Sequence, residues 1–184
     1  NTLAGGALDW MLESGFTKKE LIPYNYPSVE DFIEHNIQIV YLGWFLGDWS
    51  LLNNGATSAL SGVKIRRDVV QNTGDLYRIT SLDEDWVSLN QMIKYYKFGF
   101  GRASDYVNEM IRLGTITRDE GIELVTNYDG VCSEYYIRNF REFIGISIEE
   151  FWQKVISVTN RELFDISAEG VIKRKFEIGT GVIL

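Results

Sequence analysis

Two cations and two glycines stand together in the run Lys97-Phe-Gly-Phe-Gly-Arg102-Ala-Ser-Asp105. Gly99 and Gly101 allow a sharp backbone turn directly before a predicted helix, whose first amide groups and dipole favour an anion. Lys97 and Arg102 would bracket this turn with positive charge. The pattern is typical of a clamp for a phosphate or a carboxylate. The alternative is a corner between two helices, where the glycines permit close packing, Ser104 or Asp105 caps the second helix and both cations face solvent.

Further polar residues lie on either side of this run. Asp105, Glu109 and Arg112 are spaced i, i+4 and i+7, so they share one face of the predicted helix. That face could present a carboxylate to a substrate or form a solvated row of charges. Trp49 and Asn54 follow a predicted buried strand, at the position where open α/β sheets place ligands.

Composition excludes several classes of function. The chain has 184 residues, and its 26 acidic against 18 basic residues give a formal net charge of −8. An acidic surface repels phosphate backbones, so we expect no nucleic-acid binding. A single cysteine and a single histidine exclude an internal disulfide and a paired-histidine zinc site, and we expect no metal ligands.

No membrane or export signal is visible in this sequence. The most hydrophobic stretch, residues 37–52, is shorter than the roughly 20 apolar residues of a membrane span and includes Gln38 and Asp48. The first residues lack a basic segment followed by an apolar one. We therefore expect a cytoplasmic protein with no membrane span.

Hydrophobic spacing changes along the chain. A helix is predicted from Ser28, which with Asp31 has the pattern of a helix N-terminus, followed by a strand buried on both faces at residues 37–42. Residues 43–80 contain many glycines and asparagines and predict loops, with a possible helix from Trp49 or near residues 56–60, and possible brief strands at 69–70 and 76–79.

From residue 81 onward the pattern is helical. The predicted helices begin near Ser81, Ala103, Thr117, Ser133 and Ser147, and the tail at 171–178 alternates like a strand. The expected fold class is α+β and predominantly helical, with the end of an α/β nucleotide-binding domain before a helical subdomain. The predicted divisions are a partial α/β segment at 1–80, the helical subdomain at 81–165 and the tail at 166–184.

The run from Tyr95 to Asp105, continued by Glu109-Met-Ile-Arg112-Leu-Gly-Thr-Ile-Thr-Arg-Asp-Glu120 and Leu124-Val-Thr-Asn-Tyr-Asp-Gly130, resembles the C-terminal part of the N-acetyl sugar amidotransferases of lipopolysaccharide and surface-glycan biosynthesis. The segments 39–50 and 143–152 resemble that family's last core strand with its aromatic loop, and its terminal helix pair. The resemblance covers roughly residues 27–165.

The resemblance implies a nucleotide-binding domain of the adenine nucleotide α-hydrolase type, joined to a helical region. It implies that ATP, with Mg²⁺ expected, activates a sugar acetamido group, and that ammonia from a partner glutaminase and its channel subunit converts this group to acetamidino. The sugar is expected in nucleotide-linked form. The resemblance and the spacing together predict Lys97 and Arg102 as catalytic residues and Gly99, Gly101 and Ser104 as cofactor-binding residues. The predicted substrate-binding residues are Trp49, Asn54, Asp105, Glu109 and Arg112.

The chain departs from the family pattern in two places. The family's pyrophosphate loop, Ser-Gly-Gly-x-Asp-Ser, is missing, since Ala4-Gly5-Gly6-Ala7 has neither the aspartate nor the serines, and Asn90 stands where a histidine is expected. We therefore expect a C-terminal portion of the enzyme that is inactive alone and has no assured cofactor. The alternative is a non-catalytic helical module that docks a partner protein through aromatic side chains.

Overall fold

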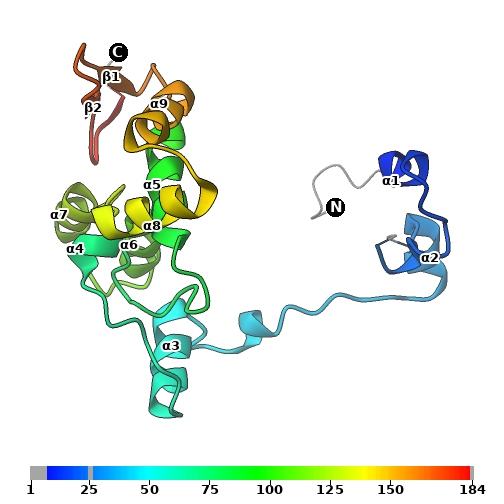
Figure 1. Ribbon diagram of the computed structural model, residues 1–184. Coiled ribbons are helices and arrows are strands. Elements are labelled where there is room, and N and C mark those ends of the chain that lie inside the picture. Colours follow the sequence, from blue (N-terminus) through cyan, green and yellow to red (C-terminus); the bar gives the residue numbers. More distant parts are fainter. Residues whose placement is uncertain (1–7, 25–26, 183–184) are drawn as a thin grey trace. The chain divides into compact units, whose positions relative to one another are not determined.

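The computed structural model describes residues 8–24 and 27–182 (Figure 1). The glycine pair Gly5-Gly6 lies outside the described residues. The chain divides into two compact units, residues 1–49 and residues 50–184. The divisions near residues 80 and 165 stay predictions.

The first unit is built from short helical segments. They are α1 (Asp9–Glu13), the 3-10 helix η1 (Ile22–Tyr24), α2 (Val29–Glu34) and the 3-10 helix η2 (Leu42–Phe45). The predicted helix start at Ser28 is confirmed, because Ser28 N–H donates to the Asp31 carboxylate at 2.9 Å and Asp31 N–H donates to Ser28 Oγ at 3.1 Å. These reciprocal bonds satisfy amide groups that have no partner inside the helix.

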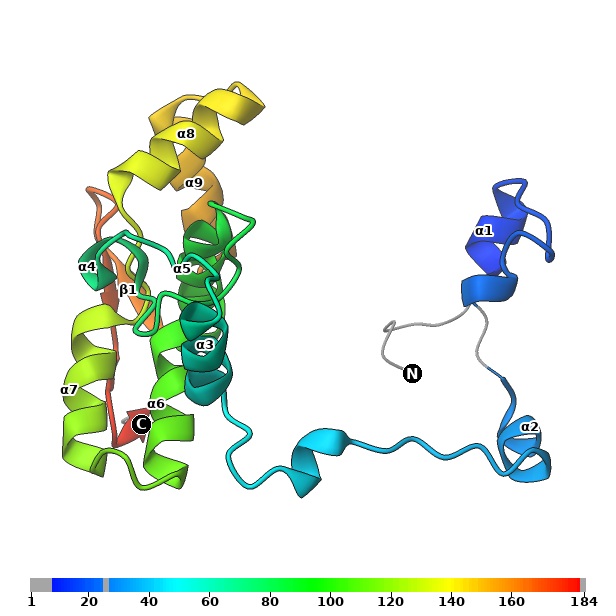
Figure 2. The same ribbon diagram turned by 90° about the horizontal axis from the view of Figure 1, so that it is seen from below.

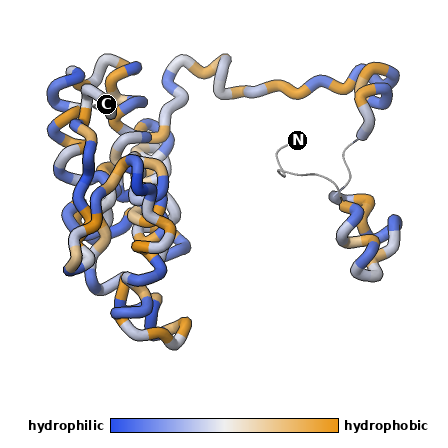
Figure 3. The backbone as a smooth tube through the Cα atoms, turned by 90° about the horizontal axis from the view of Figure 1, so that it is seen from above, coloured by the Kyte–Doolittle hydropathy of each residue, from blue (hydrophilic) through white to orange (hydrophobic). Residues whose placement is uncertain are grey.

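The prediction of a buried strand at residues 37–42 is wrong. Residues 37–41 have no regular secondary structure and Leu42 begins η2; the stretch pairs with no other segment among the described residues, and its large apolar side chains are exposed. Hydrophobic residues recur along it in Figure 3. A strand needs a neighbour to bond its N–H and C=O groups and layers to cover its faces. The short helices of this unit supply neither.

The second unit is helical through most of its length. Its helices are α3 (Leu51–Leu60), α4 (Val70–Thr73), α5 (Val87–Phe98), α6 (Arg102–Arg112), α7 (Arg118–Tyr128), α8 (Glu134–Ile144) and α9 (Ile148–Val158). Reciprocal capping bonds start α7 at Thr117 and Glu120, and α9 at Ser147 and Glu150. Helices α6 and α7 pack side by side (Figure 2).

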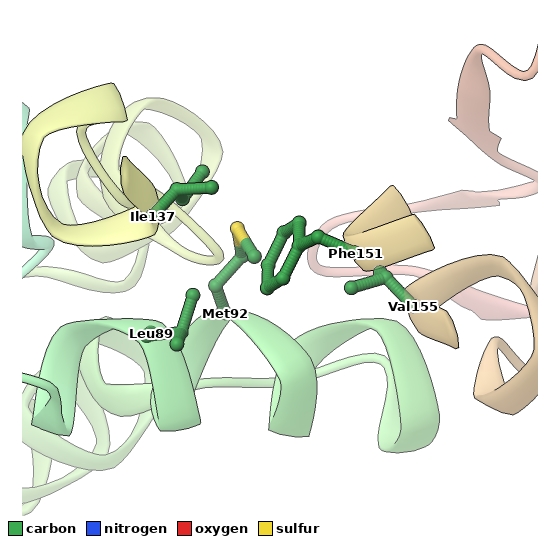
Figure 4. Close-up of a cluster of buried hydrophobic side chains, with 5 residues drawn as sticks. All are labelled: Leu89, Met92, Ile137, Phe151 and Val155. Carbon is green, nitrogen blue, oxygen red and sulfur yellow. The ribbon is translucent and has the colours of Figure 1, made fainter. Parts of the chain in front are cut away.

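The hydrophobic core joins α5, α8 and α9. Leu89 and Met92 project from α5 toward Ile137 on α8 and toward Phe151 and Val155 on α9 (Figure 4). All five side chains are buried. Their burial removes apolar surface from water, which is the main favourable contribution to folding. The C-terminal helices are therefore held together by this cluster.

The loops before α5 differ from the prediction. No strand forms at residues 69–70 or 76–79; α4 begins at Val70, and residues 74–81 form a loop. The predicted helix start at Ser81 is also wrong, since Ser81 has a positive φ of 48° and α5 begins at Val87. The buried guanidinium of Arg66 donates to the backbone oxygens of Ser81 and Glu84, so it fixes this stretch as a loop.

The tail forms two small antiparallel pairs. They are β1 (Phe164–Ile166) with β2 (Ile172–Arg174), and β3 (Phe176–Glu177) with β4 (Gly181–Val182). In the first pair Phe164 lies opposite Arg174, and in the second Phe176 lies opposite Val182. The buried ring of Phe164 packs edge-on against Tyr95 of α5. The predominantly helical α+β class is thus confirmed.

Candidate functional site

The corner between α5 and α6 is formed by the two glycines that the sequence singled out. Gly99 ends α5 with a φ of +80°, and its N–H donates to the Tyr95 carbonyl at 2.8 Å. Left-handed backbone of this kind favours glycine. A Cβ at Gly99 would lie 3.1 Å from a methyl carbon of Leu163. Gly99 therefore shapes a closely packed corner.

The N-terminus of α6 binds an anion that belongs to the chain itself. The Asp129 carboxylate accepts Gly101 N–H at 2.8 Å and Ser104 Oγ–H at 2.6 Å. It also accepts Ser104 N–H at 3.4 Å, and a Cβ at Gly101 would lie 2.7 Å from Asp129 Oδ1. A carboxylate here is favoured by the helix dipole. Asp129 thus takes the place where we expected a phosphate, while a nucleotide contact by Gly101 and Ser104 stays a prediction.

The two predicted catalytic cations point to different surroundings. Lys97 is exposed at the end of α5, with its ammonium 5.4 Å from the centre of the Phe98 ring. Arg102 is half-buried in the first turn of α6, and its Nη1 donates to Thr80 Oγ1. The side-chain contacts of these residues do not form one clamp.

Arg102 belongs to a polar group that we call the Thr80 cluster, made of Asp75, Thr80, Arg102 and Tyr106. The Thr80 hydroxyl donates to Asp75 Oδ2 at 2.9 Å and lies 2.6 Å from the Tyr106 hydroxyl. Since its one hydrogen goes to Asp75, its oxygen accepts from both Tyr106 and Arg102. The Thr80 hydroxyl, whose donor and both acceptor positions are all used, therefore links the Asp75 carboxylate to the Arg102 guanidinium.

The carboxylate of the cluster is held by the loop that precedes α5. Asp75 is only 3% exposed, and its Oδ1 accepts N–H bonds from Tyr77 at 3.1 Å and Arg78 at 2.9 Å. Its own N–H donates to Thr73 Oγ1 at 3.1 Å. Burying a carboxylate costs folding free energy unless hydrogen bonds of this kind compensate for the lost water. The loop and Arg102 together supply hydrogen bonds and a nearby opposite charge.

The phenol of the cluster is a protonated hydrogen-bond donor. Burial is the main reason that the pKa of Tyr106 is raised well above its ordinary value. The Thr80 hydrogen bond and Arg102 lower this pKa, and the Asp75 carboxylate raises it. The ring also packs against Tyr77, with 4.7 Å between centroids. The Tyr106 hydroxyl is therefore neutral at physiological pH, and it donates its hydrogen to Thr80 beside the charged Arg102.

The predicted substrate-binding residues on α6 reach separate partners. Asp105 is exposed and pairs with Lys94 at 2.8 Å, and Arg112 is exposed in the last turn. Glu109 is half-buried and accepts Leu51 N–H at 3.4 Å, at the start of α3. Asn54 lies half-buried on α3. The structure therefore brings Glu109 to the helix that carries Asn54, whereas Asp105 and Arg112 remain in solvent.

Trp49 belongs to the first unit and is described with it. Its indole lies against Gly43, where a Cβ would approach Trp49 Cδ1 to 2.9 Å, yet its side chain is largely exposed. The aromatic segment at residues 40–49 outlines an open hollow on this unit, lined by Tyr41, Trp44 and Trp49. An exposed aromatic surface is suited to stacking on a sugar or packing on a protein.

Sequence reasoning missed Asp75, Thr80, Tyr106 and Asp129. Thr80, Tyr106 and Asp129 bond partners more than twenty residues away along the chain, and Asp75 bonds within a loop for which the sequence predicts a brief strand. The available signals were the Gly74-Asp75 and Asp129-Gly130 pairs, which mark turns where an aspartate can bind backbone amides.

Residues 8–24 and 27–182 contain neither a cluster of metal ligands nor a membrane-spanning helix. No group of three or more histidine, cysteine, aspartate or glutamate side chains there is arranged to hold a metal ion. No helix in those ranges has the length and apolar character that a bilayer crossing needs.

Comparison with protein families places most of the second unit in a known family. The family described as LPS biosynthesis protein WbpG-like, C-terminal domain, matches residues 73–177, a range that contains the whole Thr80 cluster and Asp129. No curated protein matches the chain. Because the matched range spans more than half of the 184 residues, this chain belongs to the WbpG-like C-terminal domain family of lipopolysaccharide biosynthesis proteins.

Proposed function

We propose that this chain is the C-terminal portion of an ATP-dependent amidotransferase, which converts a sugar N-acetyl group to an acetamidino group in lipopolysaccharide biosynthesis. Two findings support the proposal. The family match is to a domain of lipopolysaccharide biosynthesis proteins, and the run 95–130, which carries the resemblance to sugar amidotransferases, lies inside the matched range.

In the proposed reaction, the amide oxygen of the sugar attacks the α-phosphorus of ATP and pyrophosphate leaves. Ammonia from the partner glutaminase then adds to the activated carbon, and AMP departs with the former amide oxygen. Loss of a proton leaves the acetamidino group. Both steps develop negative charge on phosphate oxygens, which preorganised donors and cations stabilise.

The observation that carries the proposal is the Thr80 cluster. Arg102 has a fixed positive charge, and Tyr106 a neutral hydroxyl, on the same face of α6. A half-buried guanidinium oriented by hydrogen bonds binds an anion at less cost in side-chain entropy than a free one. We assign to Arg102 the stabilisation of the transferred phosphate.

The remaining predicted residues fit the proposal in different ways. Exposed Lys97 can reach a phosphate from solvent, whereas Gly99, Gly101 and Ser104 act by holding the corner that carries Arg102. A direct nucleotide contact by Gly101 and Ser104 would require Asp129 to leave. In the second unit, the proposed contacts to sugar hydroxyls are Asn54, Asp105, Glu109 and Arg112. In the first unit, Trp49 is proposed by itself as a ring that stacks on a sugar.

A full-length family member tests this function. It is incubated with its glutaminase partner, glutamine, ATP and a nucleotide-linked N-acetyl sugar, and the sugar is analysed by mass spectrometry. The proposal expects one oxygen to be replaced by NH, with release of AMP, only when ATP is present. Sugar that stays unchanged while the glutaminase is active would contradict it.

A second candidate function is protein docking without catalysis. The exposed side chains of Trp44 and Phe45, at 88% and 78%, favour it, because large apolar surfaces on soluble proteins mark interaction sites. In this case a purified partner protein would bind the chain, and Trp44→Ala would weaken that binding. Titration with ATP and the sugar nucleotide would give no signal.

A further inference from the structure

A groove lies on the second unit between α9 and the turn that joins β1 to β2. Its volume is about 580 Å³, within the range of sites that hold a ligand. The residues that line it are Tyr96, Ile148, Glu149, Trp152, Gln153, Ile156, Glu169, Gly170, Val171 and Ile172. None of them belongs to the Thr80 cluster, so the groove is a separate feature.

Hydrogen bonds fix both walls of this groove. In the turn, Ser167 N–H donates to the Val171 carbonyl at 3.0 Å, and Val171 N–H donates to Ser167 Oγ at 3.2 Å. Gly170 has a φ of +82°, and a Cβ there would lie 3.5 Å from Ile156 Cδ1, so the turn lies directly against α9. Asn160 N–H, just after α9, donates to the Tyr96 carbonyl of α5 at 3.0 Å. The groove is therefore preformed.

The lining combines an apolar floor with negative charge. Tyr96, Trp152, Ile156 and Ile172 supply the apolar surface, and Trp152 adds an indole to it. Glu149 stands on the α9 wall and Glu169 on the turn. A hydrogen bond from Ser167 and one from its own backbone lower the pKa of Glu169, so this carboxylate is ionised at neutral pH. Among the described lining residues none is basic.

An apolar floor with two carboxylates favours a ligand that carries a positively charged group next to apolar side chains or carbon atoms. Two carboxylates attract a guanidinium or ammonium group, and an indole in the lining is a partner that a cation favours. The groove is open along its rim, where Val171 is 52% exposed, so a small molecule would bury little of its surface. A second copy of this chain is a poor occupant, because two chains of net charge −8 repel one another.

We propose that this groove docks a segment of a partner protein that carries an arginine or lysine flanked by large aliphatic side chains. The basic head lies between Glu149 and Glu169, and the flanking side chains cover Trp152 and the isoleucines of the floor. The proposal does not depend on the amidotransferase chemistry, since it concerns neither Arg102 nor the nucleotide.

Calorimetric titration with a short peptide tests the proposal. The probe is acetyl-Ala-Leu-Arg-Leu-Ala-amide, and the matched control replaces its arginine by citrulline, which has nearly the same shape and no charge. We expect the arginine peptide to bind with a submillimolar Kd and the citrulline peptide about tenfold more weakly. Binding of the arginine peptide should also weaken as salt is added.

A pair of variants locates the binding. Glu149→Gln with Glu169→Gln should weaken the arginine peptide about tenfold, while Glu123→Gln with Glu134→Gln should leave it unchanged. The control pair alters the net charge equally, and Glu134, like Glu149, is exposed in the first turn of a helix. Because all four side chains are exposed, the variants are expected to fold.

Several outcomes would overturn the proposal. These are no binding of the arginine peptide at millimolar concentration, equal binding of the citrulline peptide, or unchanged binding in the Glu149 and Glu169 variant. Equal affinity for butylguanidinium would assign the groove to a small molecule instead. A dimer that sediments as such in wild type but not in that variant would assign it to a second copy.

Discussion

The two units of this chain use their large apolar side chains in opposite ways. In residues 50–184, Phe151 and Phe164 are buried, at 3% and 2% exposed, among α5, α8, α9 and the tail. In residues 1–49, most large apolar side chains of segment 37–49 are exposed. Apolar residues form a core only where the segments that carry them can pack on one another. The second unit meets this condition, and the first unit meets it only at a few positions such as Leu21.

Truncation of matched aromatic residues tests this comparison and has the largest expected effect. Phe151→Ala should lower the free energy of unfolding by about 3–5 kcal/mol, because it leaves a cavity in the core of α5, α8 and α9. The matched variant Phe45→Ala, in the exposed segment of the first unit, should change it by less than about 0.5 kcal/mol. Urea denaturation followed by circular dichroism measures both. Equal losses would mean that segment 37–49 is packed.

Removal of the internal anion at α6 has the next largest effect. Asp129→Asn should destabilise the second unit by about 2 kcal/mol, because Gly101 N–H and Ser104 Oγ–H lose a charged acceptor at the helix N-terminus. The control is Asp119→Asn, in the exposed first turn of α7, where the Thr117 hydroxyl still caps the helix. If both variants unfold at the same urea concentration, Asp129 is not the cap.

Alkaline pH should weaken the second unit through its buried phenols. Burial raises the pKa values of Tyr95, Tyr96 and Tyr106 above that of an unfolded chain. Their contribution to stability is therefore present below pH 10, and it is lost as the pH rises, because the unfolded state releases its protons first. For Tyr106, whose pKa is raised strongly, the loss should approach about 1.4 kcal/mol per pH unit while the pH lies between its pKa in the unfolded and in the folded chain.

The Tyr106→Phe variant isolates one of these phenols. Its stability should fall less steeply between pH 10 and pH 11 than that of the wild type, by about 1 kcal/mol. Tyr135→Phe, at an exposed position on α8, should keep the wild-type slope. Urea midpoints at several pH values give both slopes. An unchanged slope in Tyr106→Phe would place its phenol in solvent.

The features that the sequence predicts correctly are local. The capping boxes at Ser28, Thr117 and Ser147 involve residues three apart, and glycine marks the end of α5 at Gly99. These bonds form wherever the helix forms, so a short window of sequence contains the whole signal.

The features that it misses depend on distant partners. A strand at 37–42 requires a neighbouring strand, which the described residues do not supply. The helix expected at Ser81 does not form, because Arg66 bonds the backbone there and holds it as a loop. The candidate site was found only in part. The charge of Arg102 and the neighbouring glycines mark this corner, but Thr80 lies 22 residues from Arg102 and Asp129 lies 28 residues from Gly101, so only folding brings these partners together.

The central claim is that Arg102, held by the Thr80 cluster, serves the transfer of phosphate in sugar amidination. The most direct measurement is the rate of acetamidino sugar formation by a full-length family member with alanine in place of this arginine, compared with Arg138→Ala at an exposed position on α8. We predict a loss on the order of 10²-fold for Arg102→Ala with an unchanged fold, and wild-type rates for the control. A wild-type rate in Arg102→Ala would contradict the claim.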